Sequence, residues 1–412
     1  MKKMMILFVA LVAAWCVSCS KDDDGGKTPD DPTEKARLTM KSEGQEIRLD
    51  LFSKISKITI DWGDGAVKEY DGEYVEVDNA YRVYVEYEYS QAALHTIKIS
   101  GCTDLLYLDC KSNQLTSLDV SGCTGLTELQ CYNNQLPSLD VNGCPDLVSL
   151  DCSNNQLPSL DVSGCPDLIS LHCSSNQLPS LDVSRCPDLI SLDCSSNQLP
   201  SLDVSDCPNL TSLYCSSNQL PSLDVSGCPD LTGLDCSSNQ LPSLDVSGCP
   251  ALTWLDCSSN QLPSLDVSGC PDLRKLYCFS NQLSSLDVSG CTDLMQLMCT
   301  SNQLSSLDVS GCTGLMQLIC PSNQLTSLDV SGCTDLIHLI CSGNQLPSLD
   351  VSRCPDLSHL ECDYNQFSAS ALNQIYTDLP TTDGSIAANS NPGYPESDKS
   401  IATGKGWVFS EE

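Results

Sequence analysis

Leucine, valine and cysteine recur at fixed positions from residue 101 to about residue 366, with a period of 21 residues. One unit, residues 157–177, reads Leu-Pro-Ser-Leu-Asp-Val-Ser-Gly-Cys-Pro-Asp-Leu-Ile-Ser-Leu-His-Cys-Ser-Ser-Asn-Gln. A fixed period over so long a stretch indicates a repeat architecture, in which each unit buries its apolar residues against its neighbours. The pattern therefore predicts a mainly β solenoid of about thirteen 21-residue coils over residues 101–366.

Each unit contains the same apolar spacing twice. Leu-x-x-Leu-x-Val-x-x-Cys over residues 157–165 is followed by Leu-x-x-Leu-x-Cys-x-x-Asn over residues 168–176. The repeat is therefore nested as an 11-residue and a 10-residue half, and we expect a short strand, or at least extended chain, on both sides of each coil. Sixteen of the 22 prolines occupy the positions of Pro158 and Pro166, at the entries of the half-repeats, where a missing N–H costs least.

The segments on either side of the repeat follow other patterns. Residues 37–100 alternate apolar and polar positions over 58–62, 81–87 and 95–99, which predicts half-buried strands. Residues 367–412 begin with apolar residues at helical spacing over 368–379, followed by Pro380, which predicts a short helix. An open solenoid end exposes apolar side chains and unpaired backbone groups, so we expect a β-sandwich-like N-terminal cap and a C-terminal cap that contains the helix.

The second half of each unit fits Leu-x-x-Leu-x-Leu-x-x-Asn-x-Leu, with a cysteine such as Cys173 in one leucine position. This is the leucine-rich-repeat signature, and the chain resembles the short bacterial leucine-rich-repeat class found in surface lipoproteins and, distantly, in internalins. The turn Trp-Gly-Asp-Gly over residues 62–65 is similar to the hallmark of PKD-like β-sandwiches, which implies a truncated sandwich at residues 37–100. The resemblance also implies function, since such relatives commonly bind proteins and the internalin-like ones act in adhesion.

The first 36 residues carry a targeting pattern. Lys2 and Lys3 precede an apolar run that ends in Ser18-Cys19. This resembles a bacterial lipobox, which implies that residues 1–18 are a signal peptide and that Cys19 is lipidated; an ordinary secretory signal is the alternative. The acidic residues after Cys19 are similar to the surface-export signal of Bacteroidota lipoproteins. The alternative interpretation of these residues is a plain linker. We expect residues 19–36 to form a disordered acidic tether and the protein to be lipid-anchored in the outer membrane and exposed at the surface.

The chain has 412 residues, a net charge of −34 and a pI near 4.1. Nucleic acids are not expected as partners, because binding them needs clustered lysine and arginine, and contact with a membrane is expected only through the lipid. The acidic surface either keeps an extended, monomeric protein soluble or attracts a cationic or Ca²⁺-bridged partner.

Cysteine is abundant, with 28 residues, and its spacing is regular. Beyond Cys16 and Cys19, one column of thirteen runs from residue 102 to 354 and a second from 110 to 362, both in steps of 21. Both columns occupy inward positions, where parallel Cβ vectors are poorly placed for disulfides. We expect buried free thiols that act as small apolar residues. No metal site is expected, because Cys-x-x-Cys does not occur in the repeat and histidine is scarce.

Two polar ladders follow the same period. Thirteen inward asparagines are expected to bind backbone groups of their own and the neighbouring coil: Asn113, Asn134, Asn155, Asn176, Asn197, Asn218, Asn239, Asn260, Asn281, Asn302, Asn323, Asn344 and Asn365. Twelve aspartates from Asp119 to Asp350 are expected to point outward. This aspartate ladder is interpreted as solvated and bonded to nearby serines, with Ca²⁺ binding as the alternative; no other cofactor is expected.

The outward positions of the second half-repeat vary most among the repeats and become apolar near the C-terminal end. We predict a candidate binding site there, formed by Trp254, Arg274, Lys275, Tyr277, Phe279, Met298, Ile319 and Ile340. An exposed contiguous apolar patch often marks an interaction site. The alternative is that these outward positions vary among the repeats without a binding role and are covered by a loop or the cap. Catalysis is not expected, because the four histidines belong to no repeated motif. The predicted function is non-enzymatic binding, adhesion or adaptor activity toward a protein, with a spacer protein or a glycan-binding module as alternatives.

Overall fold

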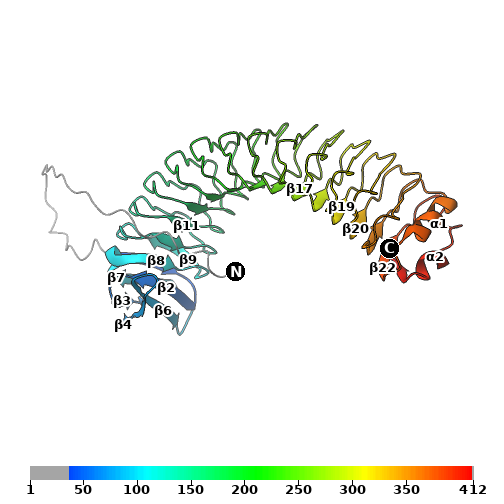
Figure 1. Cartoon of the computed structure of the whole chain (residues 1–412). Coiled ribbons are helices and arrows are strands. Elements are labelled where there is room, and N and C mark those ends of the chain that lie inside the picture. The colour runs from blue at the N-terminus through cyan, green and yellow to red at the C-terminus, as the bar shows by residue number, and fades with distance from the viewer. Residues whose placement is uncertain (1–36, 411–412) are drawn as a thin grey trace. The chain divides into compact units, whose positions relative to one another are not determined.

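The computed structural model describes residues 37–410, and the predicted signal peptide, tether and Cys19 lie outside this range. The described chain divides into two compact units whose boundary lies between Asp146 and Leu147. Figure 1 shows short strands that repeat along most of the chain and two α-helices near its C-terminal end. A short 3-10 helix, Cys102–Asp104, lies before β8 (Leu105–Asp109). No helix in residues 37–410 is both long enough and apolar enough to cross a membrane.

The first unit combines the N-terminal β segment with the first coils. Its strands are β1 (Arg37–Ser42), β2 (Glu46–Ser53), β3 (Lys57–Asp61), β4 (Val67–Asp71), β5 (Glu73–Val75), β6 (Ala80–Glu88), β7 (His95–Ser100), β8 (Leu105–Asp109), β9 (Leu115–Asp119) and β10 (Glu128–Gln130). One sheet has the order β4-β3-β7-β1-β9. The other places β2 between β6 and β8, with β5 beside β6 and β10 beside β8. The predicted strands over 58–62, 81–87 and 95–99 are confirmed as β3, β6 and β7.

The first coil is covered from its open side. β2 pairs antiparallel with β8, and β1 pairs antiparallel with β9, so the backbone groups of both sides of this coil have partners. The turn after β3 has Gly63 at φ 76° and Gly65 at φ 95°, a left-handed conformation that glycine adopts without a Cβ clash. Trp62 is fully buried and stacks on Tyr87 with ring centroids 4.1 Å apart. These contacts fit the expected capping role of residues 37–100.

The second unit is a row of parallel three-residue strands that pair in register, one per coil. They are β11 (Ser149–Asp151), β12 (Ser170–His172), β13 (Ser191–Asp193), β14 (Ser212–Tyr214), β15 (Gly233–Asp235), β16 (Trp254–Asp256), β17 (Lys275–Tyr277), β18 (Gln296–Met298), β19 (Gln317–Ile319), β20 (His338–Ile340) and β21 (His359–Glu361). The central leucine of each strand is buried, whereas the flanking residues point outward. Within this unit the coils form a curved row with the strands on its inner side (Figure 1).

The opposite side of the coils is extended chain, one of the two forms expected there, without a continuous strand ladder. In the second unit it forms only isolated bridges, which join Asp266, Asp287, Asp308 and Asp329. The proline at the entry of this half-repeat is replaced by serine or threonine in three of these four coils, at residues 284, 305 and 326. Ser284 shows the reason, because its N–H donates to the carbonyl of Pro263 at 3.4 Å, a bond that proline cannot make. Proline at most of these entries thus leaves extended chain without a ladder.

The core of the coils consists of leucine, valine and cysteine columns. All 26 cysteines from Cys102 to Cys362 are buried, as expected. In the first column a thiol such as that of Cys249 donates to the carbonyl of Val225, 24 residues earlier, at 3.6 Å. Burial raises the pKa of Cys249 to about 11 and that of Cys194, in the second column, to about 12. These thiols fill space as small apolar groups.

The asparagine ladder stitches successive coils together. Asn239 is 8% exposed, and its Oδ1 accepts from the N–H of Leu220 at 3.0 Å. Its Nδ2 donates to the carbonyls of Cys215 at 3.0 Å and Cys236 at 3.1 Å, on the preceding coil and its own. The same pattern recurs along the unit, so the ladder asparagines bond to backbone groups of their own and the neighbouring coil.

The C-terminal cap adds α1 (Ala369–Asp378), β22 (Gly384–Ala387), α2 (Ser400–Thr403) and β23 (Trp407–Phe409). The predicted helix over 368–379 is confirmed as α1, and the hydroxyl of Ser368 caps it by accepting from the N–H of Ala371. β22 and β23 extend the parallel ladder beyond β21. Asn391 extends the asparagine ladder: its Oδ1 accepts from the N–H of Asn365 at 3.1 Å, and its Nδ2 donates to the carbonyl of Cys362 at 3.0 Å.

Candidate binding face

The outward residues of strands β11 to β21 and their immediate neighbours form one surface, which we call the strand face. Each strand contributes its first and third residues, because the second points into the core. In-register pairing places equivalent residues of successive coils about 4.8 Å apart. Since the backbone positions repeat, the character of the face at any point depends on the outward side chains.

Four of the predicted residues form a continuous column on this face. Tyr277, Met298, Ile319 and Ile340 are the third residues of β17 to β20, and each pairs with the next in register. All four are half-exposed. We call this column the apolar stripe. The structure thus confirms that these four side chains are contiguous and accessible to solvent.

A second apolar column runs along the strand entries. Met295 is 39% exposed, and Met316 and Ile337 are half-exposed on the next two coils. Phe279, also half-exposed, follows Cys278 at the other edge of the apolar stripe. The apolar surface therefore extends across four coils on both sides of the first residues of the strands.

Polar side chains separate the two apolar columns. Tyr277 donates its hydroxyl to Oε1 of Gln296 at 2.7 Å, and Nε2 of Gln317 lies 3.2 Å from Nδ1 of His338. His359, on the next coil, lies 2.9 Å from Oε1 of Glu361 and contacts His338 edge-on. The apolar surface thus has a hydrogen-bonding strip along its middle, an arrangement that can orient a partner.

The predicted cationic residues lie at the N-terminal edge of the apolar surface. Arg274 and Lys275 are exposed, and within residues 37–410 neither forms an ion pair. Trp254, in contrast, does not join the apolar stripe. Its ring contacts that of Tyr214, with centroids 5.7 Å apart, on the side away from Tyr277. The structure therefore divides the predicted patch into an apolar surface over β17–β20 and a separate aromatic pair over β14–β16.

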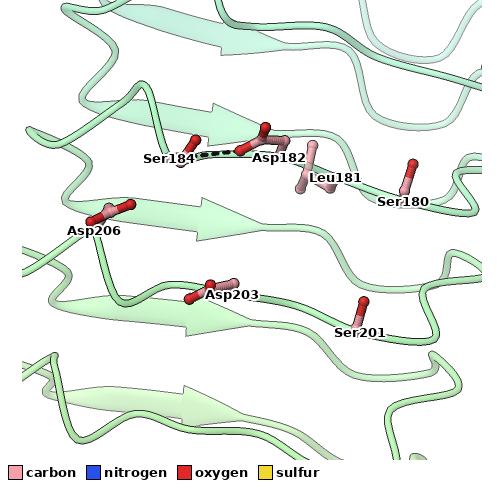
Figure 2. Close-up of a pocket in the computed structure, with 7 residues that line it drawn as sticks. All are labelled: Ser180, Leu181, Asp182, Ser184, Ser201, Asp203 and Asp206. Carbon is pink, nitrogen blue, oxygen red and sulfur yellow. Dashed lines mark hydrogen bonds between the residues drawn. The ribbon is translucent and has the colours of Figure 1, made fainter.

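The aspartate ladder lies on the other side of the coils and points outward, as expected. Oδ1 of Asp182 accepts from the N–H of Ser184 at 2.9 Å, and the same contact recurs along the ladder. The hydrogen bonds with Ser184 lower the pKa of Asp182. A small pocket of about 180 Å³ lies between two such coils, and its lining includes Asp182, Asp203 and Asp206. Figure 2 shows these side chains. No group of three or more metal-ligating residues suited to a metal ion occurs within residues 37–410.

Sequence reasoning missed two features of the sites. Asn391 lies 26 residues after Asn365, so the change of period hid its place in the ladder. The contact between Tyr214 and Trp254 was also missed, although the single glycine at position 233, in a column that is otherwise serine from residue 149 to 212, could have indicated it.

Comparison with known proteins places the repeat in a family. A model of leucine-rich repeats (two copies) matches residues 208–248, and no curated protein matches the chain. The functional domain of InlJ from Listeria monocytogenes, whose structure includes a cysteine ladder, is 31% identical over 70% of each chain, with a TM-score of 0.60.

Two other solved structures share the fold. The leucine-rich-repeat protein LIC12759 of Leptospira interrogans has a TM-score of 0.65 and 23% identity, over 74% of this chain and 83% of its own. The internalin InlF of Listeria monocytogenes has a TM-score of 0.60 and 20% identity, over 65% of this chain and 84% of its own. The 21-residue period, the asparagine ladder and the similarity to InlJ together show that the chain belongs to the leucine-rich-repeat family.

Proposed function

We propose that this protein is a non-enzymatic binding scaffold that recognises a partner protein through the apolar surface over β17–β20. The observation that carries the proposal is the apolar stripe: four half-exposed side chains, Tyr277, Met298, Ile319 and Ile340, align in register on the strand face. Solenoids of this kind use extended concave surfaces for binding. The strands that carry this stripe lie on the inner side of the second unit (Figure 1).

The composition of the surface suits a protein partner. Methionine and aromatic side chains are enriched at the centres of protein interfaces. Thioether groups such as those of Met295 and Met298 adapt their shape to the surface they meet. The hydrogen-bonding strip through Gln296 and Gln317 can orient the partner. The exposed Arg274 and Lys275 add positive charge at one edge.

Repeat drift beneath a cover does not account for this surface. The stripe residues are half-exposed with the C-terminal cap in place, and the cap strands β22 and β23 continue the ladder beyond β21 instead of folding over β17–β20. Exposed apolar side chains over four coils lower solubility, and such patches usually mark an interaction site. A spacer protein remains the competing function, and it requires no such surface.

The proposal includes a place at the cell surface. The lipobox-like Ser18-Cys19 supports lipidation of Cys19, and the acidic stretch that follows supports export to the outer face of the outer membrane. The test is metabolic labelling with a lipid analogue, together with protease shaving of intact cells. Loss of label in Cys19→Ala and digestion on intact cells are expected; label that persists in Cys19→Ala, or protection from protease, would contradict this part.

Binding is tested by site-specific crosslinking. A photoreactive amino acid at position 319 is expected to crosslink a defined surface protein, whereas the same group at position 182, on the opposite side of the coil, is not. The identified partner is then purified, and its dissociation constant is measured against the wild type and Ile319→Asp. Aspartate already occupies this strand position in other coils, at Asp193 and Asp235, so the substitution is compatible with the fold.

We expect Ile319→Asp to weaken binding at least about 30-fold, equivalent to about 2 kcal/mol for a residue at the centre of an interface. His172→Asp is the control, because it introduces the same aspartate in the same column outside the apolar stripe. Equal affinity of wild type and Ile319→Asp, or equal crosslinking from positions 319 and 182, would refute the proposal.

A further inference from the structure

The aromatic pair of Tyr214 and Trp254 is a second distinctive place on the strand face, and Gly233 makes it possible. Tyr214 and Trp254 lie on strands two coils apart, and Gly233 is on the strand between them. A Cβ at position 233 would lie 3.4 Å from Cε3 of Trp254 and 3.9 Å from the hydroxyl oxygen of Tyr214. Both rings therefore lie within van der Waals reach of a Cβ at this position, and side-chain atoms beyond Cβ would compete with them for the same space.

The two rings form an open wedge. Their planes are inclined by 44° with centroids 5.7 Å apart, so they contact at an edge without stacking. Both side chains are half-exposed, and within the described chain neither Nε1 of Trp254 nor the hydroxyl of Tyr214 has a hydrogen-bond partner. The wedge thus offers aromatic faces and two free polar groups to solvent.

Carboxylates lie directly beside the wedge. Asp235 pairs in register with Tyr214 on one side and with Asp256 on the other. One oxygen of each is occupied: Oδ1 of Asp235 accepts from the N–H of Ser237 at 3.0 Å, and Oδ1 of Asp256 accepts from that of Ser258 at 3.0 Å. The other oxygen of each carboxylate has no partner within residues 37–410, and the serine contacts hold the carboxylates in fixed orientations.

Two cationic side chains lie near these carboxylates but form no ion pair with them within residues 37–410. Lys275 pairs in register with Trp254, and Arg274 precedes it. Neither forms an ion pair with Asp235 or Asp256 in the described structure. These two cations offset Asp235 and Asp256, whereas Asp193, which pairs in register with Tyr214 on its other side, leaves one formal negative charge around the wedge.

Three classes of ligand can be compared against this arrangement. A cationic side chain would gain from the rings and carboxylates, but it would meet Lys275 and Arg274. An apolar protein surface would remove the carboxylates from water without giving them donors, which is costly. A neutral polyhydroxylated ligand satisfies all the groups: its C–H face packs on the rings, whose faces carry partial negative charge, and its hydroxyls bind carboxylate, ammonium and indole N–H.

We infer that the wedge of Tyr214 and Trp254, with Asp235, Asp256 and Lys275, is a binding site for neutral carbohydrate. A sugar ring packs on the indole of Trp254. Its hydroxyls donate to the free oxygens of Asp235 and Asp256 and accept from the ammonium of Lys275. This site adjoins the apolar stripe, because Asp256 pairs in register with Tyr277. Its two rings lie outside the stripe, and it does not depend on the protein partner proposed above.

The chain contains its own reporter for this test. Of the three tryptophans in the described residues, Trp62 and Trp407 are 0% and 1% exposed, whereas Trp254 is half-exposed. Trp15→Phe removes the fourth. Quenching of fluorescence by acrylamide then reports mainly on Trp254. The probes are neutral hexasaccharides of glucose, mannose, xylose and N-acetylglucosamine, each titrated to about 10 mM, an order of magnitude above a millimolar dissociation constant.

We expect at least one probe to protect Trp254 from acrylamide, with the quenching constant falling about twofold or more. Gly233→Ser should weaken binding by at least about tenfold because its side chain competes with both rings for space. Serine is the residue of this column in preceding coils, so the variant keeps the repeat pattern. Ser191→Gly is the matched control, and Ile319→Asp, which tests the protein site, should bind sugar unchanged.

Three outcomes would overturn the inference. The first is that no neutral hexasaccharide protects Trp254 over the whole titration. The second is undiminished binding by Gly233→Ser, since the wedge would then be irrelevant. The third is stronger protection by octa-arginine than by any sugar, which would assign the wedge to a basic protein segment. Because Ile319→Asp tests the other surface, failure here leaves the protein-binding proposal intact.

Discussion

Replacement of Asn239 by leucine tests how the coils are held together. In the wild type, Oδ1 of Asn239 accepts from the N–H of Leu220, and Nδ2 donates to the carbonyls of Cys215 and Cys236. Each of these carbonyls also accepts from a second ladder asparagine, from Asn218 at 3.1 Å and from Asn260 at 3.0 Å. Only the N–H of Leu220 loses its sole acceptor.

The magnitude follows from this difference. A buried backbone N–H without an acceptor costs about 1–3 kcal/mol, whereas carbonyls that keep one partner lose much less. We therefore expect Asn239→Leu to destabilise the neighbouring coils by about 2 kcal/mol. Gln240→Leu is the control, because the side chain of Gln240 is exposed and only its backbone N–H bonds to the neighbouring coil.

Hydrogen exchange followed by mass spectrometry is the suitable assay, because repeat proteins open locally and a single unfolding midpoint averages over many coils. Peptides that cover residues 215–245 should exchange roughly 30-fold faster in Asn239→Leu, the factor that corresponds to about 2 kcal/mol. Exchange there within twofold of the wild type, or equal acceleration in Gln240→Leu, would refute the idea that the side-chain amide joins the coils.

Three further predictions concern the thiols, the aspartate ladder and the cap. Alkylation at pH 8 in native buffer should leave the ladder cysteines after Cys102 unmodified, since burial raises the pKa of thiols such as that of Cys186, which rises to about 11, and labelling of these residues before unfolding would contradict this. Hydrogen bonds from serine lower the pKa of Asp224 and Asp245 in the folded state, so their stabilisation is present above the unfolded value near 3.8 and is lost as pH falls through the folded value. The midpoint of urea unfolding should therefore fall between pH 6 and pH 3, and it should fall less in the double variant Asp224→Asn/Asp245→Asn. An equal fall in both proteins would contradict a stabilising role of these two ionised carboxylates. Trp407→Ala should cost about 3–5 kcal/mol in urea unfolding of the C-terminal coils, because the ring is buried and donates Nε1–H to the carbonyl of Pro380 at 3.0 Å. Val408→Ala, at a 67% exposed position, should have little effect.

Much of the fold could be predicted because each coil repeats one local rule. The inward leucine, valine, cysteine and asparagine positions follow directly from the period, and so does the burial of both cysteine columns. The helix before Pro380 and the strands of residues 58–62, 81–87 and 95–99 follow from local periodicity. β1 and β2 were not expected as separate elements, since their role depends on pairing with β9 and β8 of the first coil.

The candidate sites were harder to predict because they depend on contacts between coils. The sequence aligned Tyr277, Met298, Ile319 and Ile340 correctly, since in-register stacking converts a period of 21 into a column. It did not show that Trp254 turns away from this column. That direction depends on the missing side chain of Gly233, one coil earlier, which leaves room for the ring beside Tyr214.

By itself, the sequence determined the repeating coil, its buried columns and the place of its apolar stripe, because the residues that specify them recur at a constant interval. Only the tertiary structure decided where the regularity gives way. Entry prolines that lack an N–H reduce the second ladder to isolated bridges, and Asn391 joins the asparagine ladder across an irregular interval. Gly233 separates an aromatic wedge from the apolar stripe. In each case the deciding contact is made between chain segments on different coils, where stacking geometry sets the distance.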